Sequence, residues 1–418
     1  MARVAVSCLV GSAIEFYDFL IYGTAAALVF PAVFFPNLTP GVAMIASMGT
    51  FATAFLSRPI GAAVFGYFGD RLGRKKTLIW TLVIMAVATV SVGLVPSTAS
   101  IGMAAPLILM GLRLLQGFAV GGEWAGSALL SAEYAPGGRR GRYGMFTLLG
   151  GGVAGVLSSL TFLGVNVTIG EYSPEFLQWG WRIPFLISSV LIALALYVRL
   201  NIDETPVFAE EKARDLVPKA PLAEVFRLQG REILLAAGSV LCTMAFCYMG
   251  NTYLTMYAHT HLGYTRGFIW SIGVLSGLVS IASVIISAVL SDRVGRRRLM
   301  LLGWATCVPW AFVVVPLIDT GNKALYAVAI VGTFAISGIG SGPVGAFIPE
   351  LFATRYRYSG SALAINLAGV IGGALPPLIA GTLLATYGSW SIGAMLAALA
   401  LTSLVCTYLL PETRGTSL

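Results

Sequence analysis

Apolar residues fall into long runs separated by short polar connections. A helix needs about 20 consecutive apolar residues to cross a hydrocarbon core of about 30 Å, and it satisfies its own backbone hydrogen bonds there. The short alternating segments of a membrane β-barrel are absent from the sequence. The pattern predicts an all-α integral membrane protein with twelve transmembrane helices, at about residues 5–35, 43–69, 77–95, 104–134, 143–167, 181–199, 232–258, 267–291, 299–318, 324–352, 359–385 and 389–410.

Composition agrees with a membrane location. Of the 418 residues, 57% are hydrophobic and 11% charged, whereas about a quarter of the residues in a soluble domain are charged. A soluble globule and a disordered chain are both excluded. The first run contains Glu15 and Asp18 and is too long for the core of a signal peptide, so it is predicted to be a retained span.

Lysine and arginine gather in alternate connections, which are predicted to be cytoplasmic. The clearest groups are Arg71 to Lys76, Arg139 to Arg142 and Arg293 to Arg298, and the connection after the sixth span, counted from Arg199, is also basic. Both termini are then cytoplasmic, and the net charge of +8 reports topology. We expect no nucleic-acid partner.

Metal, cofactor and catalytic motifs are missing from the sequence. The five cysteines lie in apolar runs without a C-x-x-C spacing, so they are expected to be packing residues. His259 and His261 have no cysteine or carboxylate close by in sequence and make a poor metal site. No H-E-x-x-H, G-x-S-x-G or P-loop pattern occurs. We expect neither a cofactor nor enzymatic activity.

The chain contains an internal repeat. Three sequence features recur about half a chain apart: Asp70 with Asp292, Glu133 with Glu350, and Glu204 with Glu412. Such a repeat predicts two pseudo-symmetric six-helix bundles that alternate access to a midplane site. The predicted division is an N-terminal bundle at 1–200, a cytoplasmic linker at 201–230 and a C-terminal bundle at 231–418.

Five ionisable residues fall inside predicted spans: Glu15, Asp18, Arg58, Arg113 and Glu123. Each costs about 2.5 to 3.5 kcal/mol at the bilayer centre, so they must face inward and pair. Together they carry one net negative charge, and such a set is best neutralised by one additional proton.

Several motifs carry a family resemblance over the whole chain. The segment from Gly66 to Lys76 (GYFGDRLGRKK) resembles the loop signature of the major facilitator superfamily, and Pro411 to Gly415 (PETRG) resembles a sugar-porter tail. The segments Gly11 to Asp18 and Arg113 to Trp124 are similar to the metabolite:proton symporter family within it. The resemblance implies the major facilitator fold and a cargo such as shikimate, 2-oxoglutarate, citrate, proline or betaine.

The resemblance also implies a proton site in which Asp18 pairs with Arg113. Asp18 is the leading candidate for the proton carrier. Depth along the helices leaves Glu15 and Glu123 as rivals, because they lie closer to each other in height than Asp18 and Arg113 do. The alternative is that Asp18 and Arg113 form a purely structural ion pair.

Arg58 is predicted to hold an anionic substrate together with Arg113, since the planar guanidinium suits a carboxylate. An equal alternative is that it neutralises Glu15. Tyr22 shares a helical face with Glu15 and Asp18, and this face is predicted to line the cavity. The other predicted substrate-binding residues are polar but uncharged: Gln116, Asn251, Tyr253 and Asn366.

The resemblance further implies a conformational latch at the cytoplasmic ends of the helices. Its residues are Asp70, Arg71, Arg74, Glu133 and Arg142 in the first half, and Asp292, Arg296, Glu350 and Arg357 in the second. The alternative is a set of solvated turns whose arginines only fix topology.

The sequence therefore predicts a monomeric, multi-pass transporter of the bacterial inner membrane, whose partners are protons, the lipid bilayer and a small-molecule substrate. The predicted activity is proton-coupled uptake of a small organic acid or zwitterion. The alternatives are a carrier or uniporter of a sugar or other solute with the same fold, and a nutrient receptor that does not transport.

Overall fold

The computed structural model describes residues 2–72, 74–136, 138–170, 173–201, 221–353 and 356–415, with side chains for all of these except 2–4, 69–74, 132–133, 221–224 and 226. Within these ranges every regular element is a helix. Twelve of the helical segments are long and apolar enough to cross a membrane. The predicted all-α class with twelve spans is confirmed.

The first six spans form one bundle, and short helices join some of them. The spans are α1 (Ala2–Leu28), α3 (Pro40–Leu72), α4 (Arg74–Leu94), α6 (Ala104–Glu133), α7 (Arg140–Ile169) and α9 (Ile183–Leu200). The short helices are α2 (Phe30–Phe34), α5 (Thr98–Ile101), α8 (Pro174–Gln178) and η1 (Gly180–Arg182).

The second bundle contains three spans with interruptions. One combines α11 (Pro221–Ser239), α12 (Leu241–Tyr248), the π-helical η2 (Met249–Tyr253) and α13 (Leu254–Thr260). Another combines α16 (Lys323–Ser341) with α17 (Val344–Glu350), and a third α18 (Arg357–Ala368), the π-helical η4 (Gly369–Ala374) and α19 (Leu375–Tyr387). The uninterrupted spans are α14 (Arg266–Val294), α15 (Arg296–Asp319) and α20 (Trp390–Leu409).

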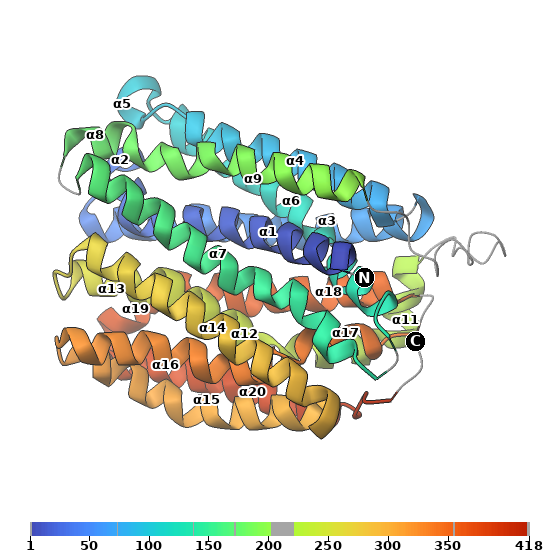
Figure 1. Cartoon of the computed structure of the whole chain (residues 1–418). Coiled ribbons are helices and arrows are strands. Elements are labelled where there is room, and N and C mark those ends of the chain that lie inside the picture. The colour runs from blue at the N-terminus through green and yellow to red at the C-terminus, as the bar shows by residue number, and fades with distance from the viewer. Residues whose placement is uncertain are drawn as a thin grey trace.

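Figure 1 shows the two bundles side by side, with both termini at one end of the helices, called here the termini end. The bundles meet where α7 packs along α14 and where α3 and α6 pack against α18. The π-helical segments η2 and η4 lie in mid-span on this seam, since η2 contacts α1 and η4 contacts α3. π-Helical turns are rare and often occur at functional sites.

The structure differs from the sequence prediction at the end of the first span and at the end of the linker. The first span was predicted at 5–35, but α1 ends at Leu28 and Pro31 belongs to the separate helix α2. Proline has no N–H and cannot continue the hydrogen bonding of α1. Helix α11 begins at Pro221, inside the segment predicted as linker, and is kinked at Gln229; the rest of that segment, 202–220, lies outside the described residues.

Glycines bring α3 and α6 into backbone contact. A Cβ atom on Gly117 of α6 would lie 1.8 Å from the carbonyl oxygen of Ala54, and one on Gly61 of α3 would lie 1.9 Å from that of Phe118. Small residues allow such close approach between membrane helices. The contact brings the segment of α3 that carries Arg58 against α6, which carries Arg113.

We predict that Gly117→Ala destabilises the protein by about 1 to 3 kcal/mol, because the added methyl group forces α3 and α6 apart. Gly111→Ala in the same helix is the matched control, since a Cβ there meets nothing within 4 Å. Thermal unfolding of the purified protein in detergent measures both. Equal midpoints for the two variants would contradict the proposed close contact.

Candidate functional site: a buried charge cluster beside a central cavity

One face of α1 carries acidic side chains into the N-terminal bundle. Glu15, Asp18 and Tyr22 are spaced by three and four residues, which places them on one helical face. All three are buried, and Asp18 and Tyr22 have no exposed surface. The face points into the bundle as expected, but none of the three side chains lines the cavity between the bundles, to which α1 contributes Phe16.

Asp18 and Arg113 are joined by a chain of hydrogen bonds. Among the described ion pairs there is none between them. Instead, Arg113 donates to the Gln116 side-chain oxygen at 2.7 Å, the Gln116 amide donates to the Thr89 hydroxyl at 2.5 Å, and that hydroxyl donates to Asp18 Oδ2 at 2.7 Å. The direct contact implied by the family resemblance is replaced by this relay. Thr89 of α4 was missed because nothing in its local sequence marks it.

Aromatic rings surround the two central arginines. The Arg113 guanidinium carbon lies 3.8 Å from the ring centre of Tyr22 and 4.4 Å from that of Phe19. The Arg58 guanidinium carbon lies 4.0 Å from the Phe19 ring and 4.3 Å from the Phe55 ring. Desolvated cation–π contacts of this kind are worth about 2 kcal/mol each. Phe19 therefore contacts both cations, which helps to hold them away from water.

Glu123 has a different partner from those expected. It forms a buried ion pair with Arg199 of α9, and it also accepts a hydrogen bond from Thr81 at 3.0 Å. Arg199 donates in addition to the carbonyl oxygen of Leu78. The sequence interpretation counted Arg199 among the basic residues of the connection after the sixth span, and that assignment is corrected here. Its position at the end of an apolar run did not reveal that it turns inward.

Gly11 provides the space for this ion pair. A Cβ atom at Gly11 would collide with the guanidinium of Arg199 and lie 3.3 Å from Glu123 Oε1. The absence of a side chain at this position of α1 lets the pair pack directly against the helix backbone. With Arg199 included, the buried set contains three carboxyl groups and three guanidinium groups. Its formal charge is zero, where the sequence predicted one net negative charge.

The charge cluster consists of Glu15, Asp18, Glu123, Arg58, Arg113 and Arg199. Glu15 and Arg58 differ from the other four because neither belongs to the ion pair or to the relay. In the part of the chain that the structure describes, Glu15 forms no hydrogen bond or ion pair, and its Oε2 atom is fully buried without a partner. Arg58 forms no ion pair with a described carboxylate. Arg58 and Glu15 therefore form no direct ion pair in this structure, and the alternative in which Arg58 neutralises Glu15 rests only on its charge acting at longer range.

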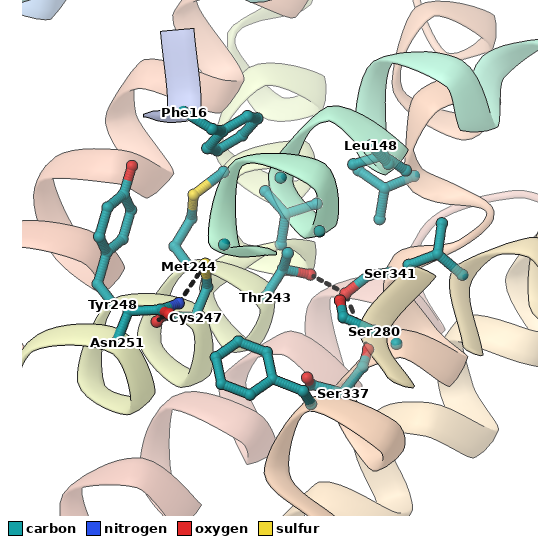
Figure 2. Close-up of a pocket in the computed structure, with 18 of the residues that line it drawn as sticks. Phe16, Leu148, Thr243, Met244, Cys247, Tyr248, Asn251, Ser280, Ser337 and Ser341 are labelled. Atoms are coloured by element: carbon teal, nitrogen blue, oxygen red, sulfur yellow. Dashed lines mark hydrogen bonds between the residues drawn. The ribbon is translucent and has the colours of Figure 1, made fainter. Parts of the chain in front are cut away.

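A cavity of about 80 Å³ lies between the two bundles. Figure 2 shows Phe16 of α1 and Leu148 of α7 on one side, with Thr243, Ser280, Ser337 and Ser341 of the second bundle on the other. Apart from apolar side chains, its lining offers hydroxyl groups, the Asn251 amide and the Tyr248 phenol. Such a lining suits a small polar molecule with an apolar body.

Tyr248 connects the cavity with the charge cluster. Its side chain lines the cavity and also interacts with Arg58. Its ring packs edge-on against Phe55 at 5.2 Å and Phe51 at 5.9 Å. Sequence analysis did not select Tyr248, since a tyrosine in an apolar run carries no sign of its direction.

The predicted substrate-binding residues are only partly brought together. Asn251 lines the cavity and donates to the carbonyl oxygen of Cys247 at 2.9 Å. Tyr22 donates to Thr50 at 2.8 Å, and Gln116 belongs to the relay. Tyr253 stacks on Tyr257, with 6.4 Å between the ring centres.

Asn366 and Tyr358 of α18 join the bundles instead of facing the cavity. Asn366 donates to the carbonyl oxygen of Gly121 at 2.8 Å, and Tyr358 donates to that of Gly122 at 2.5 Å. Both acceptors belong to α6 of the first bundle. In this structure Asn366 serves the contact between α18 and α6.

At the termini end, Asp292 of α14 caps the first turn of α7. The backbone N–H groups of Gly141 and Arg142 donate to its two carboxylate oxygens at 2.8 and 3.2 Å. A carboxylate is stabilised there by the free N–H groups and the helix dipole. Of the predicted latch residues, Asp70, Arg71, Arg74 and Glu133 have side chains outside the described residues.

A second ionic group lies beside this cap. Arg296 pairs with Glu350 at 2.9 Å, and Arg140 of the first bundle approaches Glu350 at 4.0 Å. Arg357 donates to the carbonyl oxygens of Pro349 and Phe352.

The C-terminal segment extends this ionic group. Thr413 donates to Glu350 at 2.6 Å, and Glu412 caps the first turn of α15 by accepting from the backbone N–H groups of Arg296 and Arg297 at 2.9 and 3.2 Å. The PETRG segment therefore contacts the predicted latch, although sequence analysis did not include it.

Two six-helix bundles around a central cavity, with charges buried inside the spans, are an architecture typical of secondary transporters. The family model of the Major Facilitator Superfamily matches residues 13–377, and the chain belongs to this superfamily. It is a multi-pass membrane protein that transports small molecules, and it is not an enzyme.

Curated relatives cover nearly the whole chain. An inner membrane metabolite transport protein of Escherichia coli, YhjE, is 39% identical, over 100% of this chain and 95% of the relative. The shikimate transporter of Escherichia coli is 35% identical, over 93% and 89%. The proline/betaine transporter of Salmonella typhimurium is 34% identical, over 91% and 77%.

A solved structure has the same fold. The proton:xylose symporter XylE, bound to 6-bromo-6-deoxy-D-glucose, superposes with a TM-score of 0.77 at 19% identity, over 100% of this chain and 97% of that one. At this identity the similarity concerns the fold alone.

We predict that Arg199→Met costs about 3 to 5 kcal/mol of stability, because it leaves Glu123 buried and unpaired. The double variant Arg199→Met with Glu123→Gln recovers a large part of this loss, since no isolated charge remains. Thermal unfolding in detergent, arranged as a double-mutant cycle, measures the coupling. Additive losses would show that the pair is not energetically coupled.

Proposed function

We propose that the protein is a proton-coupled symporter that takes up a small organic acid or zwitterionic metabolite. The single observation that supports this most is the central charge cluster, in which Asp18, Glu15, Arg58 and Arg113 are buried without a direct ion pair among them. A structural role alone favours direct pairing, as in Glu123 and Arg199. Buried charges without a direct ion pair are able to bind a proton or a charged cargo.

The proton is carried by the carboxyl groups on the inner face of α1. Glu123 is a weaker candidate, because Arg199 already compensates its charge. The substrate is held between the guanidinium groups of the first bundle and the hydroxyl and amide groups of the second. Tyr248 connects these two parts of the site, since it lines the cavity and interacts with Arg58.

The substrate class follows from the same groups. Guanidinium groups bind carboxylates, and hydroxyl groups bind polar substituents. The relatives named for shikimate and for proline and betaine transport carry cargo that fits this description.

The termini end is placed on the cytoplasmic side of a bacterial inner membrane. The support is the excess of lysine and arginine in the connections at this end, together with the relative named as an inner membrane protein. Uptake then begins from the end at which α2, α5 and α8 lie.

We predict that the double variant Glu15→Gln, Asp18→Asn loses uphill uptake, because no carboxyl group remains on α1 to take up a proton. Purified protein in liposomes with an alkaline interior is tested with labelled shikimate, proline and glycine betaine. Proton entry is followed with an internal pH-sensitive dye. The matched control is Glu175→Gln, an exposed residue in the first turn of α8.

Accumulation by the wild type and the control, with none by the double variant, supports the proposal. Accumulation that persists in the double variant, or wild-type transport without proton entry, would overturn it.

The termini end acts as the latch between the bundles. We predict that Asp292→Ala shifts the protein toward a state that is open at this end, because α7 loses the carboxylate that caps it across the seam. Cysteines placed at exposed positions near the seam report this as faster labelling from the termini side. Asp319→Ala, at the exposed outer end of α15, is the control. Unchanged labelling would show that the cap does not hold the bundles together.

A further inference from the structure

The buried charges of the first bundle fall into three groups. Glu123 and Arg199 pair directly. Asp18 and Arg113 are connected through Gln116 and Thr89. The groups left over are one carboxyl group, Glu15, and one guanidinium group, Arg58.

The hydrogen bonds of the relay have a fixed direction. Arginine can only donate, so the Gln116 oxygen accepts from it and the Gln116 amide donates onward to Thr89. The Thr89 hydroxyl therefore directs its hydrogen to Asp18, which acts as an acceptor. Ser188 of α9 also interacts with Asp18. The relay therefore satisfies Asp18 Oδ2, while the buried Oδ1 atom has no partner in the described residues.

Glu15 has no corresponding donor. It is 4% exposed, and its buried Oε2 has no partner in the described ranges. The charged groups that act on it are Glu123 of α6, Arg58 of α3, Arg199 of α9 and Asp18 of its own helix. Of these, Arg199 is already bound to Glu123. A buried carboxyl group without a donor is least costly when it holds a proton.

Arg58 lies where the two bundles meet. Its guanidinium packs between Phe19 and Phe55, and its Nη1 atom lies 3.4 Å from where a Cβ atom on Gly369 of η4 would stand. It also interacts with Tyr248, which lines the cavity. Arg58 is therefore a cation of the first bundle that approaches both the second bundle and the cargo space.

We propose that Glu15 is the proton site and Arg58 the anion site, and that the cargo is therefore a monoanion carried with one proton. This inference rests on the proposed function. Without cargo and with Glu15 ionised, the cluster of three carboxylates and three guanidinium groups is neutral. One proton on Glu15 leaves a single positive charge, which one carboxylate at Arg58 cancels. The cluster is then neutral in both the empty and the loaded state, so the buried site bears no uncompensated charge as it changes its access.

The proton step involves no redox chemistry. The Glu15 carboxylate accepts a proton from water on one side of the membrane, forming one O–H bond. The same bond breaks when the proton leaves to water on the other side. The cargo keeps its charge throughout, and the total charge moved in each cycle is zero.

The first test measures the charge of the transported cargo in liposomes. The probes are shikimate as a monocarboxylate, succinate as a dicarboxylate and glycine betaine as a zwitterion. Wild-type protein is expected to accumulate the monocarboxylate with one proton each and without net current, at a rate that an imposed membrane potential does not change. Preferred uptake of the dicarboxylate or the zwitterion, or a steady current with the monocarboxylate, would overturn the assignment of the cargo.

Single variants separate the two carboxyl groups. Glu15→Gln is expected to retain exchange of monocarboxylate between loaded compartments and to lose net uptake, while Asp18→Asn retains proton-coupled uptake at a lower rate. Arg58→Lys is expected to weaken the apparent affinity for the monocarboxylate by about 10- to 100-fold, since the forked contact is lost. Net uptake that survives Glu15→Gln but is lost in Asp18→Asn would overturn the proposal. Glu175→Gln remains the control.

A second measurement needs no cargo. Infrared difference spectra of the purified protein during a pH titration report carboxyl groups that hold a proton in an apolar setting. The band is expected to disappear in Glu15→Gln and to remain in Asp18→Asn, and the reverse would overturn the assignment of Glu15. If no probe is accumulated and no proton moves, the proposed function fails, whereas the infrared result still decides which carboxyl group holds the proton.

Discussion

The central constraint on this protein is the cost of placing charges inside a hydrocarbon layer. A pair of charges in such surroundings is tolerated only when its geometry is good and its remaining donors and acceptors are satisfied. Glu123 and Arg199 meet this requirement in full. Thr81 donates to Glu123, Arg199 donates to the carbonyl oxygen of Leu78, and the lack of a side chain at Gly11 leaves room for the Arg199 guanidinium. Because Glu123 and Arg199 compensate each other, only the other four charges can change their protonation or bind a charged ligand. These are Glu15, Asp18, Arg58 and Arg113.

Helix packing determines where those remaining charges lie. Glycines at the contact between α3 and α6 bring the two backbones together, and this contact sets the position of Arg58 relative to Arg113. Phe19 then contacts both guanidinium groups. The same seam continues into the second bundle, where η2 and η4 replace regular α-helix in mid-span. Arg58, the cavity and the helix interruptions are therefore neighbours on this seam.

The two halves contribute different chemistry to this depth. The six charges of the cluster around α1 all come from the first bundle, while the second supplies hydroxyl groups, an amide and Tyr248 to the cavity. At the termini end the roles are shared more evenly, since Asp292 of one bundle caps a helix of the other. A transporter with this division can change its cargo-contacting groups in the second bundle without disturbing the charges of the first.

The sequence by itself determined the twelve spans, the internal repeat and the presence of charges at mid-depth, since these depend on hydrophobic run length and on the cost of burying a charge. It also placed Glu15, Asp18 and Tyr22 on one face of α1, because helical spacing is a local property. Only the tertiary structure decided that Arg199 turns inward to Glu123, that Thr89 and Gln116 separate Asp18 from Arg113, and that Asn366 binds the backbone of α6. These contacts join helices far apart in sequence. They depend on the rotation and axial shift of each helix, and the spacing of residues along one chain does not encode either quantity.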